Sequence, residues 1–91
     1  MGIVACINEE FAIQDKILNE RYKEAMQILN PERQKQLKDI QRKWITFKEA
    51  NCEFMPQGTM YLIVSANCYL DLTRDRIEWL DFIINDFEGE G

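Results

Sequence analysis

Two cysteines on either side of a glycine break constrain the fold of this chain more than any other feature. Trp44 lies eight residues before Cys52, a distance close to two helical turns. Gly58 then interrupts the pattern, and Cys68 returns on a second amphipathic segment. The spacing predicts a helical hairpin that carries one cysteine on each arm.

Apolar residues recur at helical spacing in three segments, which predict helices over about residues 4–29, 31–54 and 60–87. Asn30 suits an N-cap and Pro31 a first helical turn, and Thr59 is a second N-cap candidate after the Pro-Gly break. The expected core-facing residues are Ile7, Phe11, Leu18, Tyr22, Ala25 or Met26 and Leu29, then Leu37, Ile40, Trp44, Phe47, Ala50 or Asn51 and Phe54, and finally Ile63, Ala66, Leu70, Thr73, Ile77, Leu80, Ile84 and Phe87.

The connections between these segments are short, so successive helices are expected to run antiparallel. A chain of 91 residues corresponds to one domain. We therefore predict an all-α fold, an elongated antiparallel up-down-up three-helix bundle, in which residues 1–91 form a single helical domain. At 1.5 Å per residue the bundle is expected to be roughly 35–40 Å long.

Composition and charge argue against several classes of function. A net charge of −5 argues against nucleic acid as a partner, because phosphates attract a basic face. The chain has no His and no CxxC pair, so we expect no metal, no cofactor and no catalytic residues. Paired carboxylates such as Asp71 and Asp75 are typical of a solvated helix face. No apolar run reaches the roughly 20 residues of a transmembrane helix, and Met1–Cys6 does not form a signal peptide.

The three cysteines leave several pairings open. An odd count fits one disulfide with one remaining thiol, or three buried thiols. In an antiparallel bundle Cys52 and Cys68 approach the same end, offset by about one helical turn, and Cys6 reaches that end too. Cys52–Cys68 is the preferred pairing and Cys6–Cys52 the second.

An ordered set of residues resembles the lysozyme inhibitor LprI-like family over about residues 6–80. Its members are Cys6, Asp15, Leu18, Asn19, Tyr22, Gln41, Arg42, Trp44, Cys52, Gly58, Cys68, Thr73, Arg76 and Leu80. The chain departs from the family pattern at Lys48-Glu49, where Arg-Asp is usual, and in a shorter glycine loop. The resemblance implies a small exported helical domain, periplasmic or secreted after removal of its signal peptide, with a disulfide and an inhibitory action on lysozyme.

Structural roles are expected for most of that set. Arg42 is expected to pair with an acid across helices, Arg76 with Asp15 or a neighbour, and the Thr73 hydroxyl with a carbonyl one turn back. Asn19 and Tyr22 are expected to form a buried polar contact. Gln41 and Trp44 complete the set.

The hypothesis that follows is a non-enzymatic binding module that acts as an inhibitor of lysozyme-type glycan hydrolases. Six acids and one Arg lie between Asp75 and Gly91, and this charge could steer a cationic lysozyme. The partner-binding residues are expected in the loop after the second helix, at Phe54, Met55, Gln57, Met60 and Tyr61. The alternative is a structural or self-associating envelope protein, with a homodimer formed through Trp79, Phe82 and Ile83.

Overall fold

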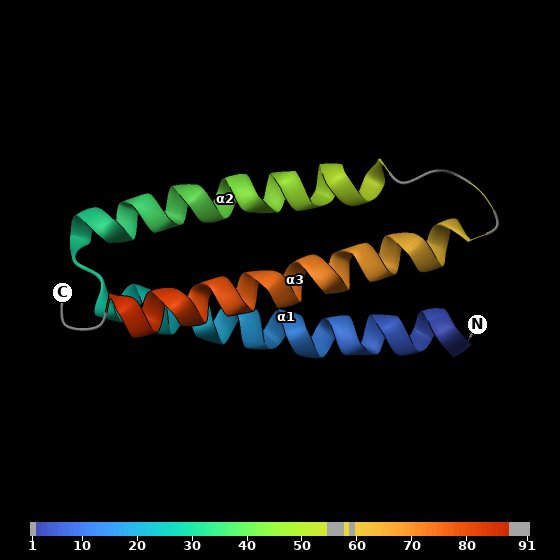
Figure 1. Ribbon diagram of the computed structural model, residues 1–91, viewed down its shortest axis with the longest axis horizontal. Coiled ribbons are helices and arrows are strands. Elements are labelled where there is room, and N and C mark those ends of the chain that lie inside the picture. Colours follow the sequence, from blue (N-terminus) through green and yellow to red (C-terminus); the bar gives the residue numbers. More distant parts are fainter. Residues whose placement is uncertain (1, 55–57, 59, 88–91) are drawn as a thin grey trace.

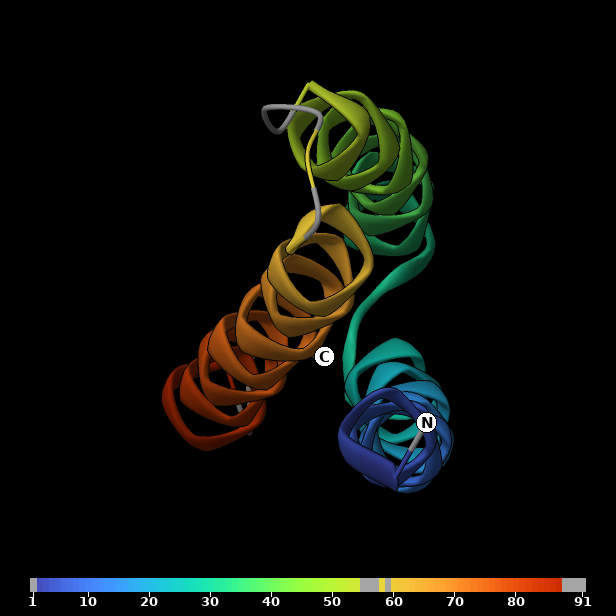
Figure 2. The same cartoon turned by 90° about the vertical axis from the view of Figure 1, so that its right-hand side faces the viewer.

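The computed structural model describes residues 2–54, 58 and 60–87. It contains three helices, α1 (Gly2–Ile28), α2 (Pro31–Glu53) and α3 (Tyr61–Asp86), and the described part of the chain has no strand. The helices run up, down and up in a shape of 48 × 22 × 15 Å, longer than the sequence estimate (Figure 1). The all-α three-helix bundle is therefore confirmed. The helix α3 packs against both other helices, and Figure 2 shows α1 and α2 on either side of it.

The helix ends follow from local chemistry. The Asn30 side-chain oxygen accepts a hydrogen bond from the backbone N–H of Arg33 at 2.9 Å, and Pro31 occupies the first helical turn, where its missing N–H costs nothing. The helix α3 begins differently, because its N-cap residue is Met60, which forms no side-chain cap bond. The expected cap Thr59 lies outside the described residues.

The apolar core lies at the end of the bundle that holds the Asn30 connection. All three helices contribute to it, and Leu18, Ala25, Leu29, Leu37 and Leu80 lie on the predicted stripes, whereas Ile83 is buried where the prediction placed Ile84. Its buried members are Leu18, Ala25, Leu29, Leu37, Leu80 and Ile83. Each fully buried Leu contributes about 1.5–3 kcal/mol, so this cluster is the main hydrophobic stabilisation of the fold.

The predicted stripe of α2 is partly wrong. Ile40, Phe47 and Phe54 are 43%, 54% and 85% exposed, whereas α2 buries Leu37, Lys48 and Cys52. The exposed residues recur every seven positions and drift around the helix away from α3. Lys48, which was not among the expected core-facing residues, is buried instead.

The apolar face considered for self-association is largely used within the chain. Ile83 is buried in the core and Trp79 packs against it, whereas Phe82 is 56% exposed. The central helix α3 thus buries two faces, which removes most of the surface that a dimer through these residues would use.

Replacing the fully buried Leu80 with Ala is expected to lower the free energy of unfolding by about 2–5 kcal/mol, because the change leaves a cavity in the core. Urea denaturation measures the loss. Phe82→Ala, on the exposed side of the same helix, is the control and is expected to change stability by less than about 0.5 kcal/mol. Equal losses for both variants would contradict the placement of the core.

Candidate functional site

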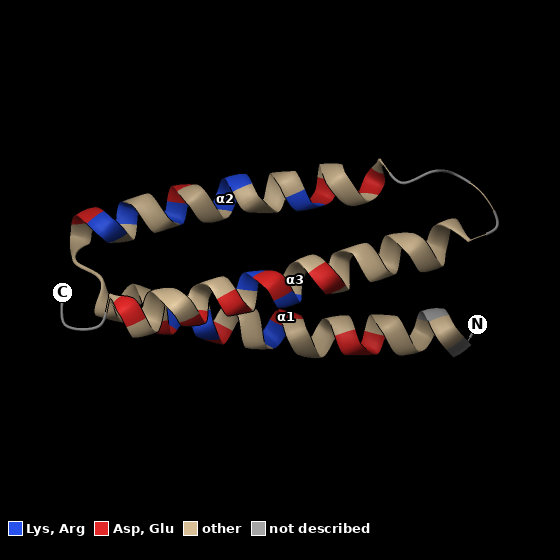
Figure 3. Cartoon of the chain, viewed as in Figure 1, with Lys and Arg blue, Asp and Glu red and all other residues tan. Residues whose placement is uncertain are grey.

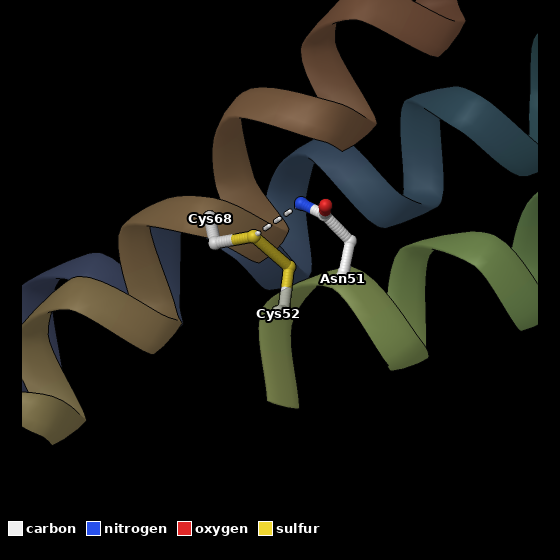
Figure 4. Close-up of a disulfide and its surroundings, with 3 residues drawn as sticks. All are labelled: Asn51, Cys52 and Cys68. Atoms are coloured by element: carbon white, nitrogen blue, oxygen red, sulfur yellow. Dashed lines mark hydrogen bonds between the residues drawn. A yellow bond between two sulfur atoms is a disulfide. The ribbon is translucent and has the colours of Figure 1, made fainter. Parts of the chain in front are cut away.

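A disulfide joins the C-terminal end of α2 to α3. Of the two pairings considered, the structure forms Cys52–Cys68, with 5.5 Å between the Cα atoms. The Asn51 side-chain amide donates a hydrogen bond to the Cys68 sulfur at 3.5 Å (Figure 4). Cys52 is fully buried, whereas Cys6 is exposed and not bridged. We call the end of the bundle near this bridge the clamped end.

The clamped end carries exposed apolar side chains. Phe54 follows the last residue of α2 and is 85% exposed, and Met60 and Leu62 at the start of α3 are 56% and 66% exposed. Tyr61 is partly buried, and Met55 and Gln57, expected as partner-binding residues, lie outside the described residues. Because large apolar groups gathered on a surface mark interaction sites, the clamped end is a candidate interface.

A buried lysine occupies the middle of the bundle. Lys48 is 9% exposed, and its ammonium nitrogen lies 4.8 Å from the centre of the Trp44 ring. The rings of Phe11 and Tyr69 lie 5.8 and 6.0 Å from the same nitrogen. The three rings come from α1, α2 and α3, so one cation is attracted to aromatic faces on every helix.

Arg76 of α3 continues this arrangement. Its guanidinium carbon lies 3.8 Å from the centre of the Trp79 ring and 5.4 Å from that of Trp44, and its Nε donates to the Gln41 side-chain oxygen at 2.9 Å. Burial lowers the pKa of Arg76 to about 10. We call Trp79, Arg76, Trp44 and Lys48, with the rings of Phe11 and Tyr69, the central stack.

Two glutamates lie near the Tyr69 end of the central stack. Burial is the largest cause that raises the pKa of the Tyr69 hydroxyl, and the negative charges of Glu53 and Glu49 raise it further. The phenol therefore stays protonated at neutral pH. Its ring serves as an uncharged partner for the Lys48 ammonium.

Several expected contacts are absent. Arg76 stacks on indole rings and bonds to Gln41 instead of pairing with Asp15. The Thr73 hydroxyl is buried without a hydrogen-bond partner among the described residues, so the expected bond to a carbonyl does not form. Within the same part of the chain, the side chain of Arg42 forms no ion pair.

A groove of about 260 Å³ lies between α1 and α2. Both helices pack on α3 more than on each other, which leaves this side open. Asn19 is exposed on its rim, so Asn19 and Tyr22 line a groove instead of forming a buried polar contact. The lining residues are Asp15, Leu18, Asn19, Tyr22, Lys38, Gln41, Arg42, Trp44, Ile45 and Lys48. We call this the α1–α2 groove.

Charge is divided unevenly among the helices. The helix α2 carries six basic and four acidic residues, whereas α3 carries two basic and five acidic ones (Figure 3). Two ion pairs tie α3 to α1, Arg21 to Asp81 at 2.9 Å and Arg74 to Glu10 at 3.7 Å. The α1–α3 pair is therefore the acidic side of the molecule, and α2 is the basic side.

The described residues contain no group of three His, Cys, Asp or Glu side chains that could hold a metal ion. None of the described helices is long and apolar enough to cross a membrane.

Lys48 and Gln41 were missed as inward-facing residues. Lys48 lies four residues after Trp44 and four before Cys52, so helical spacing alone indicated the face that it shares with them.

Fold and site together define a small, disulfide-bridged helical bundle with an exposed apolar end and an interhelical groove, the features of a binding protein. Comparison with known proteins gives the family. The family model "Lysozyme inhibitor LprI" matches residues 1–80, and the chain therefore belongs to the LprI family of lysozyme inhibitors. No curated protein and no solved structure matches the chain.

The disulfide is expected to stabilise the fold by about 3 kcal/mol, because it closes a loop across a sequence separation of 16 residues in the unfolded chain. Urea denaturation of the Cys52→Ala, Cys68→Ala double variant measures this loss. Cys6→Ala is the matched control and is expected to leave the midpoint unchanged. An unchanged midpoint in the double variant would contradict a structural role for the bridge.

Arg76→Lys is expected to lower stability by about 1–2 kcal/mol, because an ammonium lacks the flat face that stacks on Trp79 and the fork that reaches Gln41. Arg42→Lys, the same change at an exposed position, is expected to be neutral. The difference in urea midpoint between the two variants is the measurement. If both variants match the wild type, the central stack does not hold the bundle together.

Proposed function

We propose that this chain is a non-enzymatic binding protein that inhibits a lysozyme-type glycan hydrolase through its clamped end. The observation that carries the proposal is the match of residues 1–80 to the lysozyme inhibitor family. The clamped end combines exposed apolar side chains with a neighbouring disulfide, and both favour it as the contact surface.

Shape and rigidity favour the clamped end as the contact surface. Phe54 and Met60 are exposed and flank the connection between α2 and α3, and the Cys52–Cys68 bridge joins the two helices near that connection. A bridge that limits motion before binding reduces the entropy lost on binding. Exposed aromatic and Met side chains are among the residues enriched at the centre of protein interfaces.

Charge favours a cationic partner. The chain has a net charge of −5, and the acidic residues outnumber the basic ones on both α1 and α3. A field of this sign accelerates the approach of a positively charged hydrolase, and salt screens it. We therefore propose a cationic lysozyme as the partner, with an association rate that falls as ionic strength rises.

The bridge also supports export. Disulfides persist in oxidising compartments and are rare where thiols are kept reduced. A buried Cys52 in a bridge and membership of the inhibitor family both agree with a periplasmic or secreted protein.

The test is calorimetric titration of the oxidised protein into a cationic c-type lysozyme, combined with an assay of residual lytic activity. We expect sub-micromolar binding and loss of lysis. The Phe54→Ala, Met60→Ala double variant is expected to bind about tenfold to a hundredfold more weakly, because exposed apolar anchors supply much of the binding energy.

Phe82→Ala is the matched control, because Phe82 is 56% exposed, like Met60, and lies near the opposite end of the bundle. It is expected to bind and inhibit like the wild type. Full lytic activity without measurable heat would refute inhibition of this enzyme. Inhibition that survives the double variant would instead place the contact surface elsewhere on the chain.

A further inference from the structure

Lys48 is a mostly buried lysine whose ammonium has no anionic partner among the described residues. The residue is 9% exposed and no described carboxylate lies within 4 Å of its nitrogen, and that nitrogen is not among the fully buried polar atoms left without a hydrogen-bond partner. Charged residues are seldom buried to this extent unless they are paired. The aromatic rings around it offset part of the desolvation but supply no negative charge.

This cation lies on the wall of the α1–α2 groove, together with two others from the same helix. Lys38 and Arg42 are exposed, and neither forms an ion pair with any described residue. Asp15 is the one acidic residue that lines the groove. Three cations against one carboxylate make the groove locally positive on a chain whose net charge is −5.

The polar groups in the groove fit a particular kind of anion. An Arg fork and an ammonium are suited to a carboxylate, which Arg42 can bind in a bidentate manner. Asp15 on α1 is an acceptor for hydroxyl groups, and the amides of Asn19 and Gln41 add donors and acceptors.

We propose that the α1–α2 groove is a binding site for a small hydroxylated carboxylate of the sugar-acid class. Arg42 and Lys48 hold the carboxylate, and Asp15 and the two amides bind the hydroxyl groups. The groove volume of about 260 Å³ matches a single ring of this kind. The site is separate from the clamped end, so the proposal does not depend on whether the chain inhibits a lysozyme.

The test is an NMR titration of the isotope-labelled protein at constant ionic strength with three matched probes: glucuronate, glucose and glucose 6-phosphate. Glucose removes the carboxylate from the same ring, and the phosphate ester exchanges it for a phosphate. We expect glucuronate to bind at least tenfold more tightly than either other probe. The reporting signals are the Trp44 indole N–H and the side-chain amides of Asn19 and Gln41.

Two variants test the charge. Arg42→Gln is expected to weaken glucuronate binding at least fivefold, and because Arg42 is exposed this variant keeps its fold. Lys48→Met removes the buried charge at similar volume and is expected to abolish binding. Lys43→Gln is the matched control: Lys43 lies next to Arg42, pairs with Asp39 at 3.1 Å and lies outside the groove.

Three results would overturn the proposal. The first is equal binding of glucose and glucuronate, or no binding of either. The second is a stronger response to glucose 6-phosphate, which would indicate a phosphate site. The third is an equal loss for Lys43→Gln and Arg42→Gln, which would reduce the effect to the general charge of α2.

Discussion

Two cations in the middle of the bundle determine how the three helices meet. Burying an ion costs several kcal/mol even after relaxation, and each aromatic contact with a cation returns about 0.5–2 kcal/mol. Arg76 has a buried guanidinium nitrogen without a hydrogen-bond partner and Lys48 is 9% exposed; both lie against rings from more than one helix, and Trp44 contacts both. This arrangement fixes the rotation of α2 about its axis, because Trp44, Lys48 and Gln41 must all face inward.

The rotation explains why the two ends of the molecule differ. Leu37 meets the apolar core near Asn30, and Cys52 meets Cys68 at the other end. Between them α2 depends on the central stack more than on hydrophobic burial. The same rotation turns Phe54 outward at the clamped end and leaves the α1–α2 groove open, so both proposed binding surfaces result from how α2 is held.

Much of the fold could be predicted from the sequence, because it rests on local rules. Three amphipathic periods, the Asn30-Pro31 start and the two breaks locate the helices within one or two residues. The interior of α2 could not be predicted in the same way. A hydrophobic count favours Phe47 over Lys48, although the lysine shares the helical face of Trp44 and Cys52, and in the fold its ammonium lies near the rings of Phe11 and Tyr69 from the other two helices. Of the residues expected to bind a partner, Phe54 and Met60 are exposed, and their role in binding stays a prediction. The groove depends on the separation of two helices, which single-segment patterns do not encode.

We propose that the clamped end binds the hydrolase while the rest of the bundle stays as it is. Hydrogen exchange of the oxidised protein, alone and bound to a cationic c-type lysozyme, tests this directly. The amides of residues 60–64 are the most informative, because those of Tyr61 and Val64 bond to the carbonyls of Gly58 and Met60, which precede α3, and such terminal bonds open easily. The account predicts slower exchange in this segment and around Cys52 on binding, with no change in the core near Asn30. Protection confined to the Asn30 end, or to the walls of the α1–α2 groove, would contradict it.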